Sequence, residues 1–93
     1  MKRVKRENFR SRVPEGALFI GRPSRYGNPF KVSEYGRAEA LSKYSDFLSA
    51  LIADKPDFLK PLVGSDVACY CNLEDECHGD IIIRFIQEGL GIS

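Results

Sequence analysis

The sequence predicts a small single-domain α/β fold, in which about three mostly parallel strands are covered by two main helices. Short apolar runs bounded by glycine and proline indicate buried strands. A long segment with helical periodicity separates two of these runs, and a last apolar segment follows the final one. With 93 residues, the chain is expected to be one domain, residues 1–93.

Three segments are predicted to be strands. Residues 3–9 alternate weakly between apolar and charged residues, which favours a short edge strand within a basic N-terminal arm, residues 1–12. The apolar run 17–20 lies between glycine-containing turns and is expected to be the central or second strand. Residues 66–71 form the next strand, in which Tyr70 faces away from its two cysteine neighbours because side chains alternate.

Two main helices are predicted. Residues 77–89 form the last helix, with Gly89 and Gly91 as its stop signals. A short helical turn is expected over residues 56–62. The long helix covers about residues 36–53, where apolar side chains repeat at spacings of three and four: Ala40, Leu41, Tyr44, Phe47, Leu48, Leu51 and Ile52.

The net charge of +1 hides a strong asymmetry. Residues 1–37 hold ten Lys or Arg against three Glu, whereas residues 38–93 hold four against ten acids. The basic half can attract phosphates of a nucleotide or of a nucleic acid, or it can neutralise the acidic half within the fold. No apolar run approaches the roughly 20 residues that span a bilayer, and no secretory signal is recognisable, so we expect a cytoplasmic protein without a membrane partner.

The loop of residues 21–30 is a candidate ligand-binding segment. Its two glycines and two prolines exclude regular helix or strand, and it follows a predicted strand, where α/β sheets usually bind their ligands. Guanidinium, hydroxyl and amide groups suit a phosphate, a carboxylate or a base edge. The candidate ligand-binding residues are Arg22, Ser24, Arg25 and Asn28. The alternative is a rigid turn with solvated arginines.

The cysteine-rich segment offers a candidate metal site. Three cysteines in a reducing compartment indicate metal binding or a reactive thiol before they indicate disulfides. Four residues match the ligand types of a zinc site: Cys69, Cys71, Cys77 and His78. The spacing fits less well, because two cysteines separated by one strand residue have α-carbons about 6.6 Å apart.

The start of the last helix is a candidate catalytic or anion-binding site. Free N–H groups and the helix dipole there can hold a phosphate or stabilise a thiolate on Cys77. His78 can carry a proton near neutral pH. Asp80 can orient His78, act as a base, or simply complement the helix terminus. If strands 17–20 and 66–71 are parallel neighbours, this segment and the 21–30 loop meet at one sheet edge and form a cleft.

The two loops contain the motifs Gly21-Arg-Pro-Ser-Arg-Tyr-Gly-Asn-Pro-Phe30 and Cys69-Tyr-Cys followed by Cys77-His-Gly-Asp80. Together these motifs resemble those of a family of small phage and bacterial proteins, domain of unknown function 4326. The resemblance covers about residues 17–88 and implies a compact α/β domain without an established activity. Tyrosine stands at positions 26 and 70 where tryptophan is common, and an acidic loop, residues 72–76, replaces one that usually contains proline.

The leading functional hypothesis is a small protein that binds a phosphorylated or nucleotide-like ligand between the 21–30 loop and residues 77–80. The sequence leaves open whether it is an enzyme that processes nucleotides or nucleosides. The alternative is a non-enzymatic module that binds a host protein or a nucleic acid through its basic N-terminal half. This module can be formulated with or without a stabilising zinc ion.

Overall fold

A computed structural model describes residues 1–8, 10–22 and 24–89. Phe9 and Pro23, and with them parts of the predicted first strand and first loop, lie outside the described residues, as does the predicted stop at Gly91. The helices and strands follow in the order β1 (Arg3–Lys5), β2 (Ala17–Phe19), α1 (Val32–Tyr35), α2 (Arg37–Asp54), the 3-10 helix η1 (Lys60–Leu62), β3 (Asp66–Cys69) and α3 (His78–Gly89).

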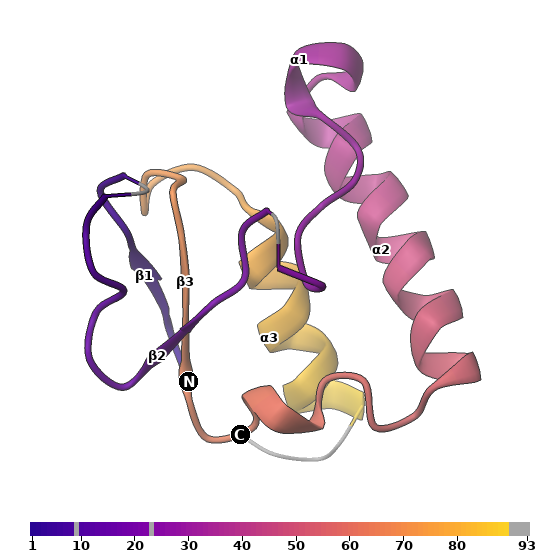
Figure 1. The fold of residues 1–93 in the computed structure, drawn as a ribbon. Helices are drawn as coiled ribbons and strands as arrows, with labels where there is room; N and C mark the ends of the chain where they lie inside the picture. The colour runs from indigo at the N-terminus through magenta and orange to yellow at the C-terminus, as the bar shows by residue number, and fades with distance from the viewer. Residues whose placement is uncertain (9, 23, 90–93) are drawn as a thin grey trace.

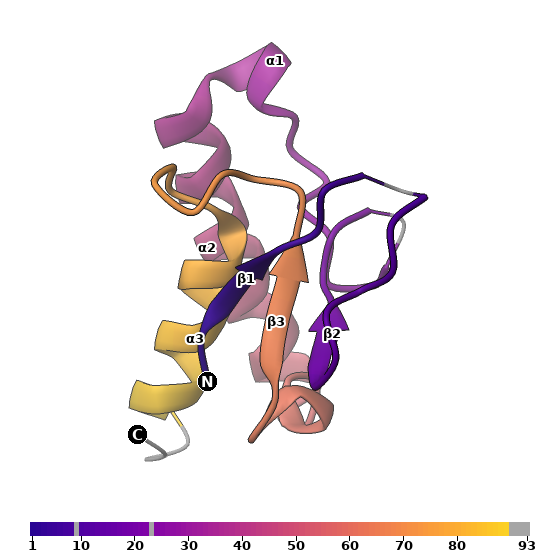
Figure 2. The ribbon, with the colours of Figure 1, turned by 90° about the vertical axis from the view of Figure 1, so that its left-hand side faces the viewer.

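The three strands form one parallel sheet in the order β1-β3-β2 (Figure 2). In the register, Val4 and Phe19 both lie opposite Ala68. The fold class and the parallel pairing of the second and third strands are therefore confirmed. Residues 17–19 are the second strand of the chain, as one of the two expectations had it. The other expectation, a central position, is wrong, because β3 takes that position and its residues Val67 and Ala68 are fully buried while Leu18 is 41% exposed.

The long helix α2 begins at Arg37 and ends at Asp54, close to the predicted bounds. Its buried residues Ala40, Tyr44 and Leu48 lie on the predicted apolar face. The additional short helix α1 was not predicted, because four residues give no periodicity. Gly36 separates α1 from α2 with a φ of 80°, a conformation that glycine adopts without steric cost.

The helices cover one face of the sheet, and α3 lies between the sheet and α2 (Figure 1). Figure 2, turned by 90°, shows the sheet toward the viewer with α2 behind it. The core is one apolar cluster whose largest fully buried side chains include Ile20, Tyr44, Leu48, Leu62, Val67, Ile82 and Ile86. Within the described residues, we found no helix with the length and hydropathy of a membrane span.

The parallel pairing sends the chain segments that follow β2 and β3 to the same edge of the sheet. The ladder extends slightly beyond the strands, since the N–H of Ile20 donates to Ala68 O at 2.8 Å and the N–H of Arg6 donates to Cys69 O at 2.7 Å. Both candidate loops therefore start at neighbouring positions, as the sequence predicts.

Candidate functional site

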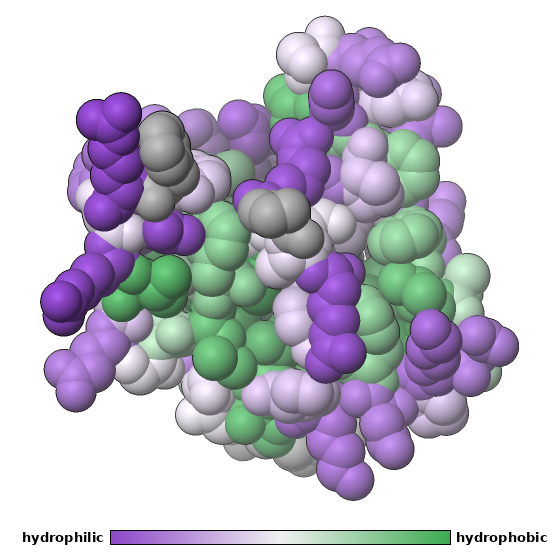
Figure 3. Space-filling model, in the orientation of Figure 1, coloured by the Kyte–Doolittle hydropathy of each residue, from purple (hydrophilic) through white to green (hydrophobic). Residues whose placement is uncertain are grey.

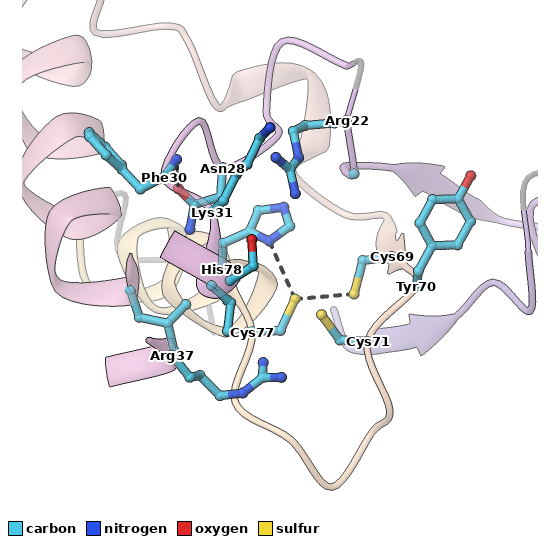
Figure 4. Close-up of a pocket in the computed structure, with 14 residues that line it drawn as sticks. Arg22, Asn28, Phe30, Lys31, Arg37, Cys69, Tyr70, Cys71, Cys77 and His78 are labelled. Atoms are coloured by element: carbon cyan, nitrogen blue, oxygen red, sulfur yellow. Dashed lines mark hydrogen bonds between the residues drawn. The ribbon is translucent and has the colours of Figure 1, made fainter. Parts of the chain in front are cut away.

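A cavity of about 640 Å³ lies where the two loops meet (Figure 4). Residues of the 21–30 loop, of α1 and the start of α2, and of the cysteine-rich segment all contribute to its wall. Its volume lies within the roughly 300–1,000 Å³ of small-molecule sites. The lining residues are Gly21, Arg22, Asn28, Phe30, Lys31, Val32, Ser33, Arg37, Leu41, Cys69, Tyr70, Cys71, Cys77 and His78.

The 21–30 loop is held in shape by its own polar groups. Asn28 accepts a hydrogen bond from the N–H of Phe30 at 2.8 Å and donates to Ala40 O of α2 at 3.3 Å. A Cβ on Gly27 would lie 2.8 Å from Arg22 Cγ and 3.0 Å from Arg22 N, so only glycine fits without a shift. Asn28 and Gly27 thus fix the backbone from which Arg22 projects.

Tyr26 anchors the same loop in the core. Its backbone carbonyl accepts a hydrogen bond from the hydroxyl of Tyr44 at 2.8 Å, and its own hydroxyl donates to Phe58 O at 3.2 Å. Tyr44 is fully buried, and burial raises the pKa of its hydroxyl, so the group remains a neutral donor. These hydrogen bonds therefore tie the loop at Tyr26 to α2 and to the segment that precedes η1.

Three cationic side chains line the cavity: Arg22, Lys31 and Arg37. None of the described lining residues is acidic. Arg37 donates to Glu76 O at 2.6 Å and so connects the start of α2 to the cysteine-rich segment. Phe30, Val32 and Leu41 supply apolar wall. The cavity thus combines positive charge with apolar surface, which suits an organic anion.

The cysteine sulfurs form a compact group beside the cavity. The Sγ atoms of Cys69, Cys71 and Cys77 all lie within 4.8 Å of one another, and all three cysteines are free thiols. Cys69 Sγ and Cys77 Sγ are 3.2 Å apart (Figure 4). These three cysteines can hold a metal ion. Tyr70 points away from the sulfurs, as predicted (Figure 4). Strand alternation is not the reason, because β3 ends at Cys69, short of the predicted end at residue 71, and Tyr70 lies in the bend that follows.

His78 is buried next to these thiols. Its Nε2 lies 2.8 Å from Ile20 O, and because a carbonyl oxygen only accepts, Nε2 carries the proton. Its Nδ1 lies 3.4 Å from Cys77 Sγ and offers a lone pair to the sulfur group. Burial lowers the pKa of His78, which favours the neutral ring.

The thiols of Cys69 and Cys77 have different acidities. The hydrogen bond from Cys69 lowers the pKa of Cys77, and the N–H of Gly79, 3.5 Å from Cys77 Sγ, acts in the same direction. The same hydrogen bond, together with burial, raises the pKa of Cys69. Of these two thiols, Cys77 loses its proton more readily, yet Cys77 is only 2% exposed, which restricts its access as a nucleophile.

Asp80 occupies a structural position at the start of α3. Its carboxylate accepts from the N–H of Cys77 at 3.1 Å and pairs with Arg3 Nε at 3.2 Å. Asp80 lines a second hollow of about 490 Å³ instead of the main cavity. Three roles were considered for Asp80, and the geometry fits the one in which its carboxylate complements the N-terminus of α3. Because Asp80 already accepts the N–H of Cys77, fewer backbone N–H groups remain there to bind an anion.

Arg3 is an organising residue of the site that the sequence analysis missed. Its side chain is only 7% exposed and donates to three carbonyl oxygens of the loop between β3 and α3, those of Asn72 (3.3 Å), Leu73 (2.9 Å) and Asp75 (2.6 Å). Its Nη1 also lies 3.9 Å from Cys69 Sγ. A single arginine of β1 thus holds the cysteine-rich loop in place.

The predicted ligand-binding residues separate into two groups. Arg22 and Asn28 line the cavity together with Cys77 and His78. Ser24 and Arg25 do not belong to the lining set. Ser24 Oγ instead accepts from the N–H of Tyr26 at 3.3 Å.

Arg25 lies against aromatic rings instead, with its guanidinium 5.2 Å from the Tyr26 ring and 5.8 Å from the Phe58 ring. Lys31 and Arg37 line the cavity but were not predicted. Arg37 carried a usable signal, because a cation in the first turn of a helix opposes the helix dipole and such local conflicts gather at functional sites.

The chain was compared with known protein families, curated proteins and solved structures. The family model described as Domain of unknown function (DUF4326) matches residues 3–88 and so includes β1 as well as both loops. Neither the curated proteins nor the solved structures gave a match. The matched segment covers nearly the whole chain, and the protein therefore belongs to the DUF4326 family.

Proposed function

We propose that this protein binds a small phosphorylated or nucleotide-like ligand in the cavity between the 21–30 loop and the start of α3. The observation that carries the proposal is the convergence of Arg22, Lys31 and Arg37 on one cavity without an acidic lining residue in the described chain. Guanidinium and ammonium groups bind phosphate oxygens through charge-assisted hydrogen bonds. Among the described residues, the side chains of Arg22 and Lys31 make no hydrogen bond or ion pair with a protein group.

The apolar part of the wall supports an organic group beside the phosphate. Phe30 packs edge-on against Tyr35 and Phe47, with ring centroids 6.0 Å away in both pairs, so its ring has a fixed orientation. A flat base or sugar ring can lie against Phe30, Val32 and Leu41 while its phosphate meets the cations. The proposal concerns ligand binding alone. Catalysis by Cys77, His78 and Asp80 is a separate prediction.

Calorimetric titration with inorganic phosphate, adenosine and a panel of nucleoside mono- and diphosphates tests the proposal. At least one phosphorylated compound is expected to bind with a Kd below about 1 mM, and adenosine is expected to bind more weakly than its phosphates. Arg22→Met should weaken binding about tenfold or more, because one charge-assisted hydrogen bond contributes about 1.5–3 kcal/mol.

Arg25→Met is the matched control, since Arg25 belongs to the same loop but lies against Tyr26 and Phe58. This variant should keep wild-type affinity. Equal loss of affinity in Arg22→Met and Arg25→Met would contradict the proposal, and so would a complete panel without detectable binding.

A second candidate function is a non-enzymatic nucleic-acid binding module, with zinc in the cysteine group as a stabilising ion. The favouring observation lies on the sheet face away from the helices, where Arg6 stacks 4.8 Å from the Phe19 ring and 5.7 Å from the Tyr70 ring. Tyr70 is 39% exposed, and aromatic rings flanked by cations suit single-stranded bases. In Figure 3, hydrophilic side chains gather over the segment that joins β1 to β2.

Binding of a fluorescent single-stranded oligonucleotide at several salt concentrations tests this second candidate. A steep loss of affinity with salt, together with a clear loss in Tyr70→Ala, is expected from phosphate contacts and base stacking. Tyr35→Ala serves as the aromatic control, because Tyr35 belongs to α1. Binding that is independent of Tyr70 would exclude this surface.

A further inference from the structure

We infer that the protein binds one zinc ion through the thiolates of Cys69, Cys71 and Cys77, with His78 Nδ1 as the fourth ligand. The inference goes beyond the phosphate-binding proposal, because the ligands are thiolates and an imidazole, and the cations of the cavity take no part. A site with four protein ligands is a closed, structural zinc site.

The distances between the sulfur atoms fit a single ion. A tetrahedral zinc ion with bonds of about 2.3 Å to sulfur separates its sulfur ligands by about 3.8 Å. Cys69 Sγ and Cys77 Sγ are 3.2 Å apart, and the three sulfurs lie within 4.8 Å of one another. The thiols thus need only small movements to surround an ion.

The end of β3 removes the objection raised by the sequence spacing. Two cysteines separated by one residue would be too far apart in an extended strand, but β3 ends at Cys69. Tyr70 and Cys71 lie in a bend, which turns the Cys71 sulfur toward the other two. Cys77 lies immediately before α3, which begins at His78, so the four ligands come from both sides of the 72–76 loop.

His78 is oriented as a zinc ligand. Its Nε2–H donates to Ile20 O at 2.8 Å, and its Nδ1 faces Cys77 Sγ at 3.4 Å. Zinc-bound histidines commonly donate their second ring nitrogen to a carbonyl in this way, which fixes the tautomer. Among the described residues, the ligand atoms that all lie within 4.8 Å of one another belong to the three cysteines and do not include a nitrogen of His78. The inference therefore requires the His78 ring to move toward the sulfurs when the ion binds.

The surroundings supply the outer contacts that three thiolates require. Zinc with three thiolates and a neutral imidazole carries one net negative charge. Arg3, with a side chain only 7% exposed, lies 3.9 Å from Cys69 Sγ and provides a nearby positive charge. The N–H of Gly79 points to Cys77 Sγ at 3.5 Å. Such contacts to ligand atoms typically change metal affinity 10–100-fold when they are removed.

The first test measures metal in the full chain, purified without a histidine tag or chelator and kept reduced. Elemental analysis is expected to find about one zinc per chain. Cobalt added to the metal-free protein should give the visible bands of a tetrahedral ion and the near-ultraviolet bands of thiolate ligation. A fully reduced protein that carries no zinc and binds no added zinc or cobalt would overturn the inference.

Variants identify the ligands. Cys71→Ser, at the half-exposed cysteine, should abolish stoichiometric binding, whereas Glu74→Gln in the same loop should bind one zinc like the wild type. His78→Gln should weaken zinc binding and change the cobalt bands toward three-sulfur ligation. An unchanged cobalt spectrum in His78→Gln would exclude His78 as the fourth ligand, and full zinc content in Cys71→Ser would overturn the site.

The two proposals fail independently. Arg22→Met should lose phosphate binding and keep one zinc, because Arg22 contributes no ligand atom. If the wild type holds zinc but binds no phosphorylated compound, the zinc site stands and the phosphate proposal fails. If phosphate binds to a protein that never takes up zinc, the opposite holds.

Discussion

Replacement of Arg3 by methionine should be among the most destabilising single changes outside the apolar core. The side chain makes three hydrogen bonds to carbonyl oxygens of residues 72, 73 and 75 and an ion pair with Asp80. At about 1 kcal/mol for each hydrogen bond, the bonds sum to about 3 kcal/mol. Asp80 is 52% exposed, so its pair adds only about 0–1 kcal/mol.

Part of this loss is recovered when water replaces the guanidinium at the exposed carbonyls, and methionine keeps the apolar packing of the side-chain stem. The expected loss is therefore about 2–3 kcal/mol in the free energy of unfolding. Urea denaturation of the reduced, metal-free protein, followed by circular dichroism, measures it. The metal-free form is used so that a change in metal affinity does not contribute.

Arg12→Met is the matched control, because Arg12 is an exposed arginine of the same basic half whose side chain makes no hydrogen bond or ion pair within the described part of the chain. Its effect should stay within about 0.5 kcal/mol. If Arg3→Met costs less than about 1 kcal/mol, or no more than Arg12→Met, then Arg3 does not hold the cysteine-rich loop and the reasoning is refuted.

Three further changes have defined outcomes. Tyr44→Phe removes the hydrogen bond to Tyr26 O and leaves that carbonyl without its buried donor, so unfolding by urea should show a loss of about 1–2 kcal/mol; a loss below about 0.3 kcal/mol would contradict this. Gly27→Ala places a Cβ against Arg22 and should destabilise by about 1–3 kcal/mol and weaken phosphate binding, as calorimetry can show; wild-type stability would mean that the loop has room. Chelation should lower the thermal midpoint of the wild type and leave Cys71→Ser unchanged, and equal shifts in both proteins would argue against a structural metal.

Much of the fold could be predicted from the sequence because its signals are local. The long helix follows from apolar residues at spacings of three and four, and Ala40, Tyr44 and Leu48 are indeed its buried residues. The parallel pairing of β2 and β3 follows from the helix between them. The central position of β3 could not be predicted, because it depends on β1 pairing with a strand more than 60 residues later.

The geometry of the candidate site was predicted in outline. Parallel strands bring the loops that follow them together whatever the loop sequences are, so the sequence could predict that Arg22, Asn28 and His78 lie near one another. The sequence could not predict the direction in which each side chain points. Ser24 and Arg25 share the loop but engage Tyr26, and only the three-dimensional turn decides this.

The role of Arg3 was also out of reach for sequence analysis. Its carbonyl acceptors lie in residues 72, 73 and 75, about 70 residues away, and backbone acceptors leave no trace in the sequence. The cysteines differ from Arg3 in this respect, because their residue type alone indicated a candidate metal site. What the sequence lacked was the bend after Cys69 that makes their spacing compatible with one ion.

The most direct test of the central claim is an amide chemical-shift map of the ¹⁵N-labelled protein titrated with the tightest-binding phosphorylated compound. A ligand in the cavity should give its largest shifts at Gly21, Lys31 and His78, which line the cavity from three different segments. Shifts concentrated at Arg6 and Phe19, which do not line the cavity, would place binding on the outer face of the sheet and contradict the claim that the two loops form the ligand site.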